Sequence, residues 1–430
     1  MPRILPFQGV RYNPARVPDI TRVTAPPYDM IPPAEQEALY GRDPHNVVRL
    51  ILGREQENGR PVDRYANAAR DYRRWRSEGI LAQDAVPSIY LYREDYSWAG
   101  RSYQRLGLIA RIGIDEFGGG AFAHESTMSG PKADRLRLLQ ACEANFSQIF
   151  ALYSDPDGSV EAPLVAATST PPLVSFDDGK GVVHNLWRVE DQGLIARARE
   201  GFAGKPFIIA DGHHRYETAL EYRRLMRLEP GRFRESMDSV MMCLVRMESP
   251  GLTILPFHRM LTAPGPERIL ERIGAAFELE ERTLPVDRSS WTGATQELLD
   301  GEGTVFGLHR GGRTLTVLRP KAGYDLSRHL RPGTSPLAAD LDVTVLHQVI
   351  FAGLLGLEEQ RLVQEGGIRF FTKTEDAAAE IEAGRGAATF LLRPSRIDQV
   401  WRIATAGQRM PQKSTNFYPK LVSGLVFNEL

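Results

Sequence analysis

The segment of this 430-residue chain that most restricts its fold is a short apolar run that stops at Asp211-Gly212 and continues as a helical pattern. The run at residues 207–210, Phe-Ile-Ile-Ala, has the composition of a strand buried on both faces. The residues after the turn repeat with the spacing of one helix face: Tyr216, Ala219, Leu220 and Met226. The segment therefore predicts a strand, a tight turn and a helix.

The turn itself is crowded with polar and titratable groups. The N-terminus of a helix leaves backbone N–H groups unpaired and carries about half a positive charge. Gly212, His213 and His214, with the guanidinium of Arg215, therefore form a candidate anion site, for which phosphate or carboxylate is the natural ligand. The alternative is structural: Asp211 caps the helix, and the two histidines are ordinary surface residues.

A second group of such residues follows the glycine run at residues 118–120, which can act as a hinge or let a ligand approach the backbone. Glu125 comes after it, and Lys132 and Arg135 lie at the start of a predicted helix. Phosphoryl transfer uses a base for the acceptor hydroxyl and cations for the phosphate charge, and these residue types supply both. A glutamate on a loop is also commonly a solvated charge, so both interpretations of Glu125 stay open.

The tail at residues 410–420 is predicted to be one irregular loop. It gathers side chains that suit an anionic ligand: Lys413, Ser414, Thr415, Tyr418 and Lys420. The alternative is a terminal strap that only docks on the rest of the protein.

The organisation of the chain follows from proline content and from the alternation of patterns. The first 45 residues are rich in proline, which predicts an extended arm that delivers Tyr28 and Asp29 to a surface or merely docks there. The apolar run at residues 47–52 predicts a strand, and residues 63–79 predict an amphipathic helix. Strands and helices then alternate, which indicates an α/β or α+β core.

Three parts are therefore expected. Residues 1–85 would form an arm and a helix packed on the core, and residues 86–262 an α/β core that carries the Asp-Gly-His-His-Arg loop. The composition changes at residues 262–266, Thr-Ala-Pro-Gly-Pro, so residues 263–430 would form a second, C-terminal α+β domain. Its last strand is expected at residues 400–404, ahead of the loop-like tail.

Composition limits the class of protein. An apolar content of 42% with 25% charged residues is typical of a soluble globular protein, and the formal charge of −1 argues against a nucleic-acid partner. Cys142 and Cys243 are far apart and form no paired motif, which argues against disulfides and structural zinc. No apolar run approaches the roughly 20 residues of a membrane span. We expect a cytoplasmic protein with no membrane segment.

Segments along the whole chain, in order, resemble the uncharacterised bacterial and archaeal family called domain of unknown function 1015. They are residues 25–29, 45–50, 124–125 with 132–135, 210–219, 255–259, 341–347 and 410–420. The loop Asp211-Gly-His-His-Arg215 also resembles the phosphate-binding loop of the ParB/sulfiredoxin-like superfamily, especially of its free-serine kinases, which phosphorylate the amino acid itself. This second resemblance implies a ParB/sulfiredoxin-like core.

The leading hypothesis is a small-molecule kinase that transfers a phosphoryl group from a nucleotide or pyrophosphate to a hydroxylated metabolite such as serine, with Mg²⁺ as cofactor. The expected catalytic residues are Glu125, Asp211 and His213. The expected phosphate-binding residues are Gly212, His214, Arg215, Lys132 and Lys413.

Two other classes of function stay open. A metal-dependent hydrolase would use as ligands to Zn or Mn the side chains of Asp211, His213, His214 and His124. A ParB-like regulator would bind a nucleotide or nucleic acid without turnover. The sequence has neither a P-loop nor a Gly-x-Gly-x-x-Gly motif after a strand, so neither of those nucleotide sites is expected.

Overall fold

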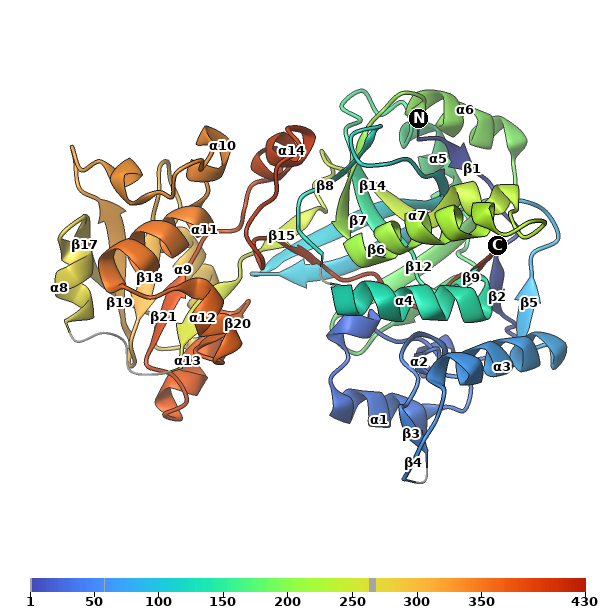
Figure 1. The fold of residues 1–430 in the computed structure, drawn as a ribbon, viewed down its shortest axis with the longest axis horizontal. Helices are drawn as coiled ribbons and strands as arrows, with labels where there is room; N and C mark the ends of the chain where they lie inside the picture. The colour runs from blue at the N-terminus through green and yellow to red at the C-terminus, as the bar shows by residue number, and fades with distance from the viewer. Residues whose placement is uncertain (1, 58, 128, 263–267) are drawn as a thin grey trace. The chain divides into compact units, whose positions relative to one another are not determined.

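The computed structural model describes residues 2–57, 59–127, 129–262 and 268–430. Within these ranges the chain divides into two compact units (Figure 1). Unit 1 comprises Met1–Ser97, Ser102–Leu252 and Pro419–Leu430, and unit 2 comprises Trp98–Arg101 and Thr253–Tyr418. Residues 263–267, where the composition changes, lie outside the described residues. Whether the segments 1–85, 86–262 and 263–430 fold as separate domains stays a prediction.

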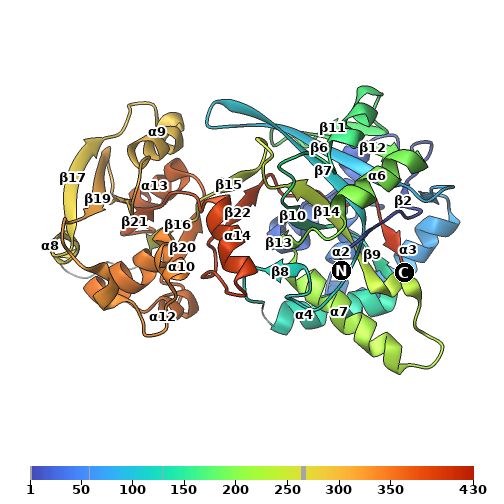
Figure 2. The same ribbon diagram turned by 90° about the horizontal axis from the view of Figure 1, so that it is seen from above.

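A mixed sheet, nine-stranded in the described residues, forms the centre of unit 1. Its strands run in the order β11-β12-β6-β7-β14-β10-β13-β8, with β1 paired to β7 (Figure 2). The pairs β10/β14 and β13/β8 are parallel, and the pairs β1/β7, β10/β13, β11/β12, β12/β6 and β14/β7 are antiparallel. This sheet and its helices confirm the expected mixed α/β class. The strands are β1 (Ile4–Leu5), β6 (Ile89–Trp98), β7 (Arg101–Gly113), β8 (Ala121–Ala123), β10 (Ile149–Tyr153), β11 (Val174–Asp177), β12 (Val182–Val189), β13 (Phe207–Asp211) and β14 (Ser239–Arg246).

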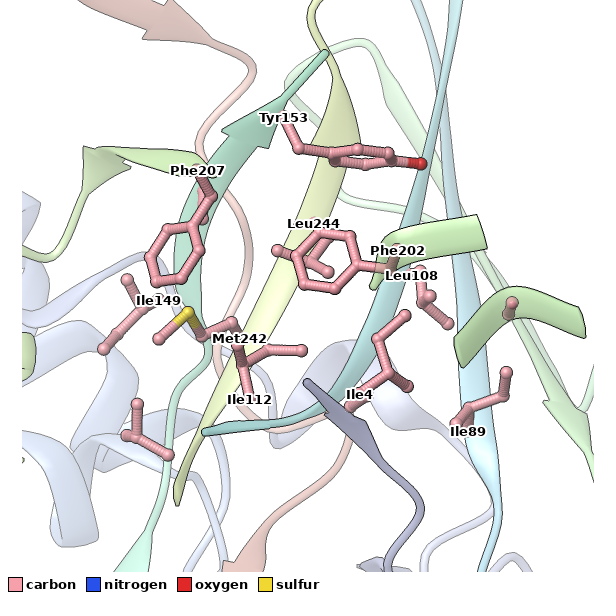
Figure 3. Close-up of a cluster of buried hydrophobic side chains, with 14 of the residues drawn as sticks. Ile4, Ile89, Leu108, Ile112, Ile149, Tyr153, Phe202, Phe207, Met242 and Leu244 are labelled. Atoms are coloured by element: carbon pink, nitrogen blue, oxygen red, sulfur yellow. The ribbon is translucent and has the colours of Figure 1, made fainter. Parts of the chain in front are cut away.

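The main core of unit 1 lies between this sheet and two helices, α6 (Gln192–Phe202) and α7 (His213–Leu228). Figure 3 shows Phe202 of α6 packed among strand residues that include Phe207 and Leu244. Seven of the eight residues of β14 are buried, because both faces of the sheet are covered at this strand. The strand predicted at residues 207–210 is confirmed, since these residues form β13 and all four are buried.

Further helices complete unit 1, and α4 lies alongside α7 in both views (Figures 1 and 2). The α-helices are α1 (Pro33–Arg42), α2 (Val48–Ile51), α3 (Arg64–Ser77), α4 (Ser129–Cys142) and α5 (Ala162–Val165). The 3₁₀ helices are η1 (Ile20–Arg22), η2 (Tyr28–Met30), η3 (Ala166–Ser169) and η4 (Glu235–Asp238).

The N-terminal arm and the C-terminal residues Pro419–Leu430, here called the strap, lie side by side in unit 1. Ala25 exchanges two backbone hydrogen bonds with Ser423, at 3.2 and 2.8 Å, and Val10 exchanges two with Phe427. The strap therefore holds the arm in place at two positions, Val10 and Ala25. The short strand pairs here are β2 (Val10–Tyr12) with β5 (Leu81–Gln83), β9 (Ala144–Asn145) with β23 (Asn428–Glu429), and β3 (Gln56–Glu57) with β4 (Arg60–Pro61).

The strand expected at residues 47–52 is wrong, because the chain forms helix α2 there. Asn46 is fully buried, its Oδ1 accepts a hydrogen bond from the amide of Val48 at 2.9 Å, and its Nδ2 donates to the carbonyl of Thr24. This side-chain turn starts a helical turn and outweighs the strand preference of the valines. A short apolar run of this kind does not distinguish a buried strand from a buried helix.

Unit 2 is built on an antiparallel sheet, six-stranded within the described ranges, of order β17-β19-β18-β21-β16-β20. The strands are β16 (His258–Leu261), β17 (Phe277–Thr283), β18 (Phe306–His309), β19 (Thr314–Pro320), β20 (Ile368–Phe371) and β21 (Ala388–Leu391). The helices are α8 (Ile269–Gly274), η5 (Arg288–Ser290), α9 (Trp291–Leu298), η6 (Leu326–His329), α10 (Pro336–Ala339), α11 (Asp342–Thr344), the π-helical η7 (Val345–Leu355), α12 (Glu359–Gln364), α13 (Thr374–Glu382) and α14 (Ile397–Thr405).

Two expectations for unit 2 are wrong. The strand expected at residues 400–404 is helix α14, in which Val400, Ile403 and Ala404 are buried with the i, i+3, i+4 spacing of one helix face. The tail is not wholly irregular, because β22 (Asn416–Tyr418) pairs antiparallel with β15 (Thr253–Leu255). Among the described residues, no helix is both long and apolar enough to cross a membrane.

Candidate anion-binding site

The junction between β13 and α7 is a sharp turn at Gly212. Gly212 has φ 94° and ψ 28°, a left-handed conformation that side chains disfavour. A Cβ atom there would lie 2.8 Å from Nη2 of Arg215. Glycine therefore lets the strand enter the helix directly, with the guanidinium folded back over the turn. The first-turn amides at the start of α7 face out of this turn, which gives it positive potential.

Arg215 is anchored on one side of the turn. Its Nη1 donates to the carbonyl of Gln148 at 2.6 Å and to the hydroxyl of Ser147 at 3.0 Å, and its Nη2 lies 3.8 Å from a carboxylate oxygen of Asp211. Its Nε is buried, and no described residue accepts a hydrogen bond from it. A buried donor without an acceptor is costly, so an anion that reached this atom would be stabilised.

Asp211 ends β13 and pairs with a lysine of the strap. Lys420 donates to Oδ2 of Asp211 at 2.7 Å, and about a fifth of each side chain is exposed. Burial by itself would raise the pKa of the Asp211 carboxyl, but Lys420 and Arg215 together hold that pKa well below its ordinary value. Asp211 is therefore ionised at neutral pH, and it is a weak proton acceptor.

His213 and His124 form a buried pair behind the turn. Their ring centroids are 4.8 Å apart with the planes at 70°, and Nδ1 of His124 donates to the carbonyl of Ile209 at 2.8 Å. This hydrogen bond fixes the ring of His124 against β13. In the part of the chain that the structure describes, no three His, Cys, Asp or Glu residues are placed to hold a metal ion. The ligand set expected for a metal hydrolase is therefore not assembled.

His214 faces a group of charged side chains at the start of α4 and α7. Burial lowers the pKa of His214, Lys132 and Arg215 lower it further, and Glu217 and Asp29 oppose them. Lys132 forms an ion pair with Glu217 at 2.9 Å. Sequence reasoning missed Glu217, although a residue three positions after His214 lies on the same face of the helix.

The arm brings Tyr28 and Asp29 to the same region. The guanidinium of Arg135 lies 3.8 Å from the centroid of the Tyr28 ring, and its Nη1 donates to the carbonyl of Ile51 at 2.7 Å. Burial raises the pKa of Tyr28, while the positive charges of Arg135 and Arg215 oppose that rise. Tyr28 therefore lies within electrostatic range of Arg215 at the turn.

Glu125 and Lys413 are placed differently. Glu125 follows β8, whose parallel pairing of Ala123 with Ile209 puts the carboxyl ends of β8 and β13 at one edge of the sheet. Lys413 belongs to unit 2, where its carbonyl accepts a hydrogen bond from Arg259 at 2.9 Å. Its expected part in the phosphate site stays a prediction. The lysine of the tail that reaches the turn is Lys420.

Comparison with known proteins gives one family and several distant structures. The family model described as "Protein of unknown function (DUF1015)" matches residues 4–344. No curated protein matches the chain.

The similar solved structures have low sequence identity and low TM-scores. They include a free serine kinase variant in complex with AMP (10% identity, TM-score 0.35, 72% of this chain and 87% of that chain covered) and a conserved hypothetical protein from Pyrococcus furiosus (12%, 0.33, 73% and 92%). SbnI from Staphylococcus aureus is another (8%, 0.33, 74% and 86%). TM-scores of this size do not establish a shared fold.

Proposed function

The chain belongs to the DUF1015 family of proteins of unknown function, and we propose that it transfers a phosphoryl group from a nucleotide or pyrophosphate to the hydroxyl of a small metabolite such as free serine. The observation that carries this proposal is the concentration of positive charge at the N-terminus of α7. Arg215 and Lys420 both face Asp211, within 3.8 and 2.7 Å, and the first-turn amides of the helix add their dipoles. Such a turn suits the phosphates of a donor.

In this proposal the donor phosphates lie on the amides of Gly212 to His214. The buried Nε of Arg215 and the ammonium of Lys420 balance the charge on the phosphoryl oxygens, and Lys132 and His214 line the side nearest α4. His213 supports the turn from behind through its contact with His124. This arrangement uses every cation expected from the sequence except Lys413, which belongs to unit 2.

The transfer needs a base for the acceptor hydroxyl. The lowered pKa of Asp211 makes its carboxylate a poor proton acceptor, because basicity falls with pKa. We therefore assign the base to Glu125, at the adjoining strand end, and give Asp211 the task of orienting the acceptor. The acceptor oxygen bonds to the terminal phosphorus as its proton passes to Glu125, and the bond from phosphorus to the bridging oxygen breaks toward the leaving phosphate.

Magnesium fits this arrangement in the usual way for phosphate donors. Mg²⁺ is commonly held by one or two carboxylates together with substrate phosphates rather than by a cage of protein ligands. Asp211 is ionised at neutral pH and could supply one such ligand alongside the donor. When bound, the ion would neutralise charge on the donor phosphates.

We also propose that the part of unit 1 around β13 and α7 is a ParB/sulfiredoxin-like core. The support is the direct passage from a buried strand into a helix through the Asp-Gly-His-His-Arg turn, with the parallel strand β8 beside it.

The function is tested by incubating the protein with Mg²⁺, with ATP, ADP or pyrophosphate, and with a pool of hydroxylated metabolites, followed by mass spectrometry for an added phosphoryl group. The proposal expects one phosphorylated product that depends on donor and acceptor and is lost in Glu125→Gln. Binding of a nucleotide with no product from any acceptor would favour a non-catalytic regulator. Hydrolysis that requires Zn or Mn would favour the metal hydrolase.

A further inference from the structure

A fully buried ion pair lies in unit 1 between the neighbouring strands β6 and β7. The guanidinium of Arg105 donates to Oε2 of Glu94 through Nε at 2.8 Å and through Nη2 at 2.5 Å. The two side chains are 0% and 1% exposed. The pair is also connected to Tyr92, whose hydroxyl lies 3.3 Å from Glu94 and 2.6 Å from Nδ1 of His184. Nothing in the proposed function uses this network.

A fully buried ion pair adds little net stability to a core. The desolvation of two charges commonly offsets their attraction, so an apolar pair of similar volume is often as stable. A reason for the pair is therefore to be sought in what the guanidinium does besides neutralising Glu94. Arg105 also donates from Nη2 to the carbonyl of Pro419 at 2.5 Å. Pro419 is the first residue of the strap, and the next residue is Lys420.

The strap is held on both sides of Lys420. Arg105 holds the carbonyl of Pro419, and two residues beyond Lys420 the carbonyl of Val422 accepts a hydrogen bond from Nε2 of Gln148 at 3.1 Å. The carbonyl of the same Gln148 accepts the 2.6 Å hydrogen bond from Arg215. The backbone around Lys420 is thus fixed against the strand end that also anchors Arg215. A lysine side chain has many rotamers, so a fixed backbone restricts where its ammonium can lie.

We propose that Arg105, held by Glu94, is a positioning residue that places Lys420 as a cation of the anion site, so that the C-terminal strap is a working part of the site. This inference rests on the proposed function for the role of the site. The positioning of Lys420 by Arg105 does not depend on the function of the site, because it concerns only where the ammonium of Lys420 lies.

The position of Lys420 is measured by amine acetylation followed by mass spectrometry. Only seven of the 53 basic residues are lysines, so the acetylation of each lysine can be assigned by peptide fragmentation. Arg105→Lys keeps a cation beside Glu94 but lacks the second arm that reaches Pro419. Lys420 should then be acetylated about tenfold faster, the change expected when a charge-assisted hydrogen bond is lost. Lys180, which is largely exposed, should be unchanged.

Arg223→Lys is the matched control. Arg223 lies on α7, is mostly buried, and also joins carboxylates to a backbone carbonyl, that of Ile114 at 2.7 Å, but its contacts are not with the strap. It should leave the acetylation of Lys420 unchanged. If Arg105→Lys does not fold, Glu94→Asp is the second variant, since it draws the guanidinium back while it keeps both charges.

The contribution of this placement of Lys420 to anion binding is measured by titration with pyrophosphate in a double-mutant cycle. Lys420→Met should weaken binding about tenfold or more. Arg105→Lys should weaken binding when Lys420 is present and have little further effect in the Lys420→Met background, because it acts through Lys420. Equal effects in both backgrounds, or unchanged acetylation of Lys420 in a folded Arg105→Lys protein, would overturn the inference. Absence of any pyrophosphate binding by the wild type would count against the proposed function, while the acetylation rates would still decide the positioning.

Discussion

Two acid–base pairs of unit 1 join a carboxylate to a cation over similar distances but in different surroundings. Asp211 and Lys420 lie 2.7 Å apart and are each about one-fifth exposed, whereas Glu94 and Arg105 lie 2.5 Å apart and are almost completely buried. Burial raises the pKa of Glu94 in spite of Arg105, while the cations around Asp211 hold the pKa of Asp211 down in spite of burial. Solvent exclusion prevails at one carboxylate, and neighbouring charge prevails at the other.

This difference in burial distinguishes a structural link, the pair of Glu94 and Arg105, from a binding site, the pair of Asp211 and Lys420. A pair with no contact to solvent cannot exchange its partner for a ligand without unfolding part of the core, so Glu94 and Arg105 suit a fixed link to Pro419. The pair at Asp211 is partly exposed to solvent and faces a second cation, Arg215, at 3.8 Å. An anionic ligand can therefore share these cations with Asp211 while the fold stays intact.

The largest effect on stability is expected from breaking the buried pair. Arg105→Ala leaves the carboxylate of Glu94 in the core without its cation, which should lower the free energy of unfolding by about 3–5 kcal/mol. Urea unfolding measures this. Replacing both residues by apolar ones of similar volume should restore much of the loss, and a loss below about 1 kcal/mol for Arg105→Ala would remove the contrast between the two pairs.

A smaller effect is expected at the turn that carries Asp211. Gly212→Ala forces a side chain into the left-handed region and against Arg215, so it should lower the free energy of unfolding by about 1–3 kcal/mol. Gly204→Ala is a control, since Gly204 also has positive φ, 77°, but nothing lies within 4 Å of its added Cβ. The two variants share the backbone strain, so an equal loss in both would show that Arg215 does not crowd the turn.

The smallest effect is expected from the partly exposed pair of Asp211 and Lys420, and it depends on pH. Because the pKa of Asp211 is lower in the folded protein than its ordinary value of about 3.9, the pair stabilises the fold above about pH 4 and loses this contribution as the pH falls toward the lowered pKa. Lys420→Met should therefore cost about 1 kcal/mol at pH 7 and less below pH 4. Urea unfolding across this pH range measures the difference from wild type.

Lys180→Met is the control for this measurement. Lys180 pairs with Glu35 at the surface and is largely exposed, so its removal should change stability little at any pH. A cost of Lys420→Met that stays the same from pH 7 to pH 3 would mean that the ionisation of Asp211 is not what the lysine stabilises.

The sequence was informative where a structure depends on near neighbours. The strand at residues 207–210, the glycine turn and helix α7 follow from a local run of apolar residues and one residue that tolerates positive φ. Helix α2 does not follow from the local pattern, because Asn46, whose side chain starts the helical turn, is itself held by a hydrogen bond to the carbonyl of Thr24, 22 residues away. A local pattern of residues cannot predict a contact over this distance in sequence.

The site shows the same limit on a longer scale. Lys420 is one of several donors on the tail, and its contact with Asp211 spans 209 positions of sequence, so no spacing rule singles it out from Lys413. Glu217 could have been found, because helical spacing places it beside His214 and its carboxylate balances Lys132.

The most direct test of the central claim, that the turn at the start of α7 binds phosphate, is calorimetric titration of wild type and Arg215→Ala with pyrophosphate, alongside metal analysis of these two proteins and of His213→Ala. The account predicts that the wild type binds pyrophosphate and that Arg215→Ala binds it about 10- to 150-fold more weakly, a loss of roughly 1.5–3 kcal/mol for a charge-assisted contact. Arg223→Ala should bind as the wild type does. Unchanged binding in Arg215→Ala, together with stoichiometric zinc or manganese that is lost in His213→Ala, would contradict it.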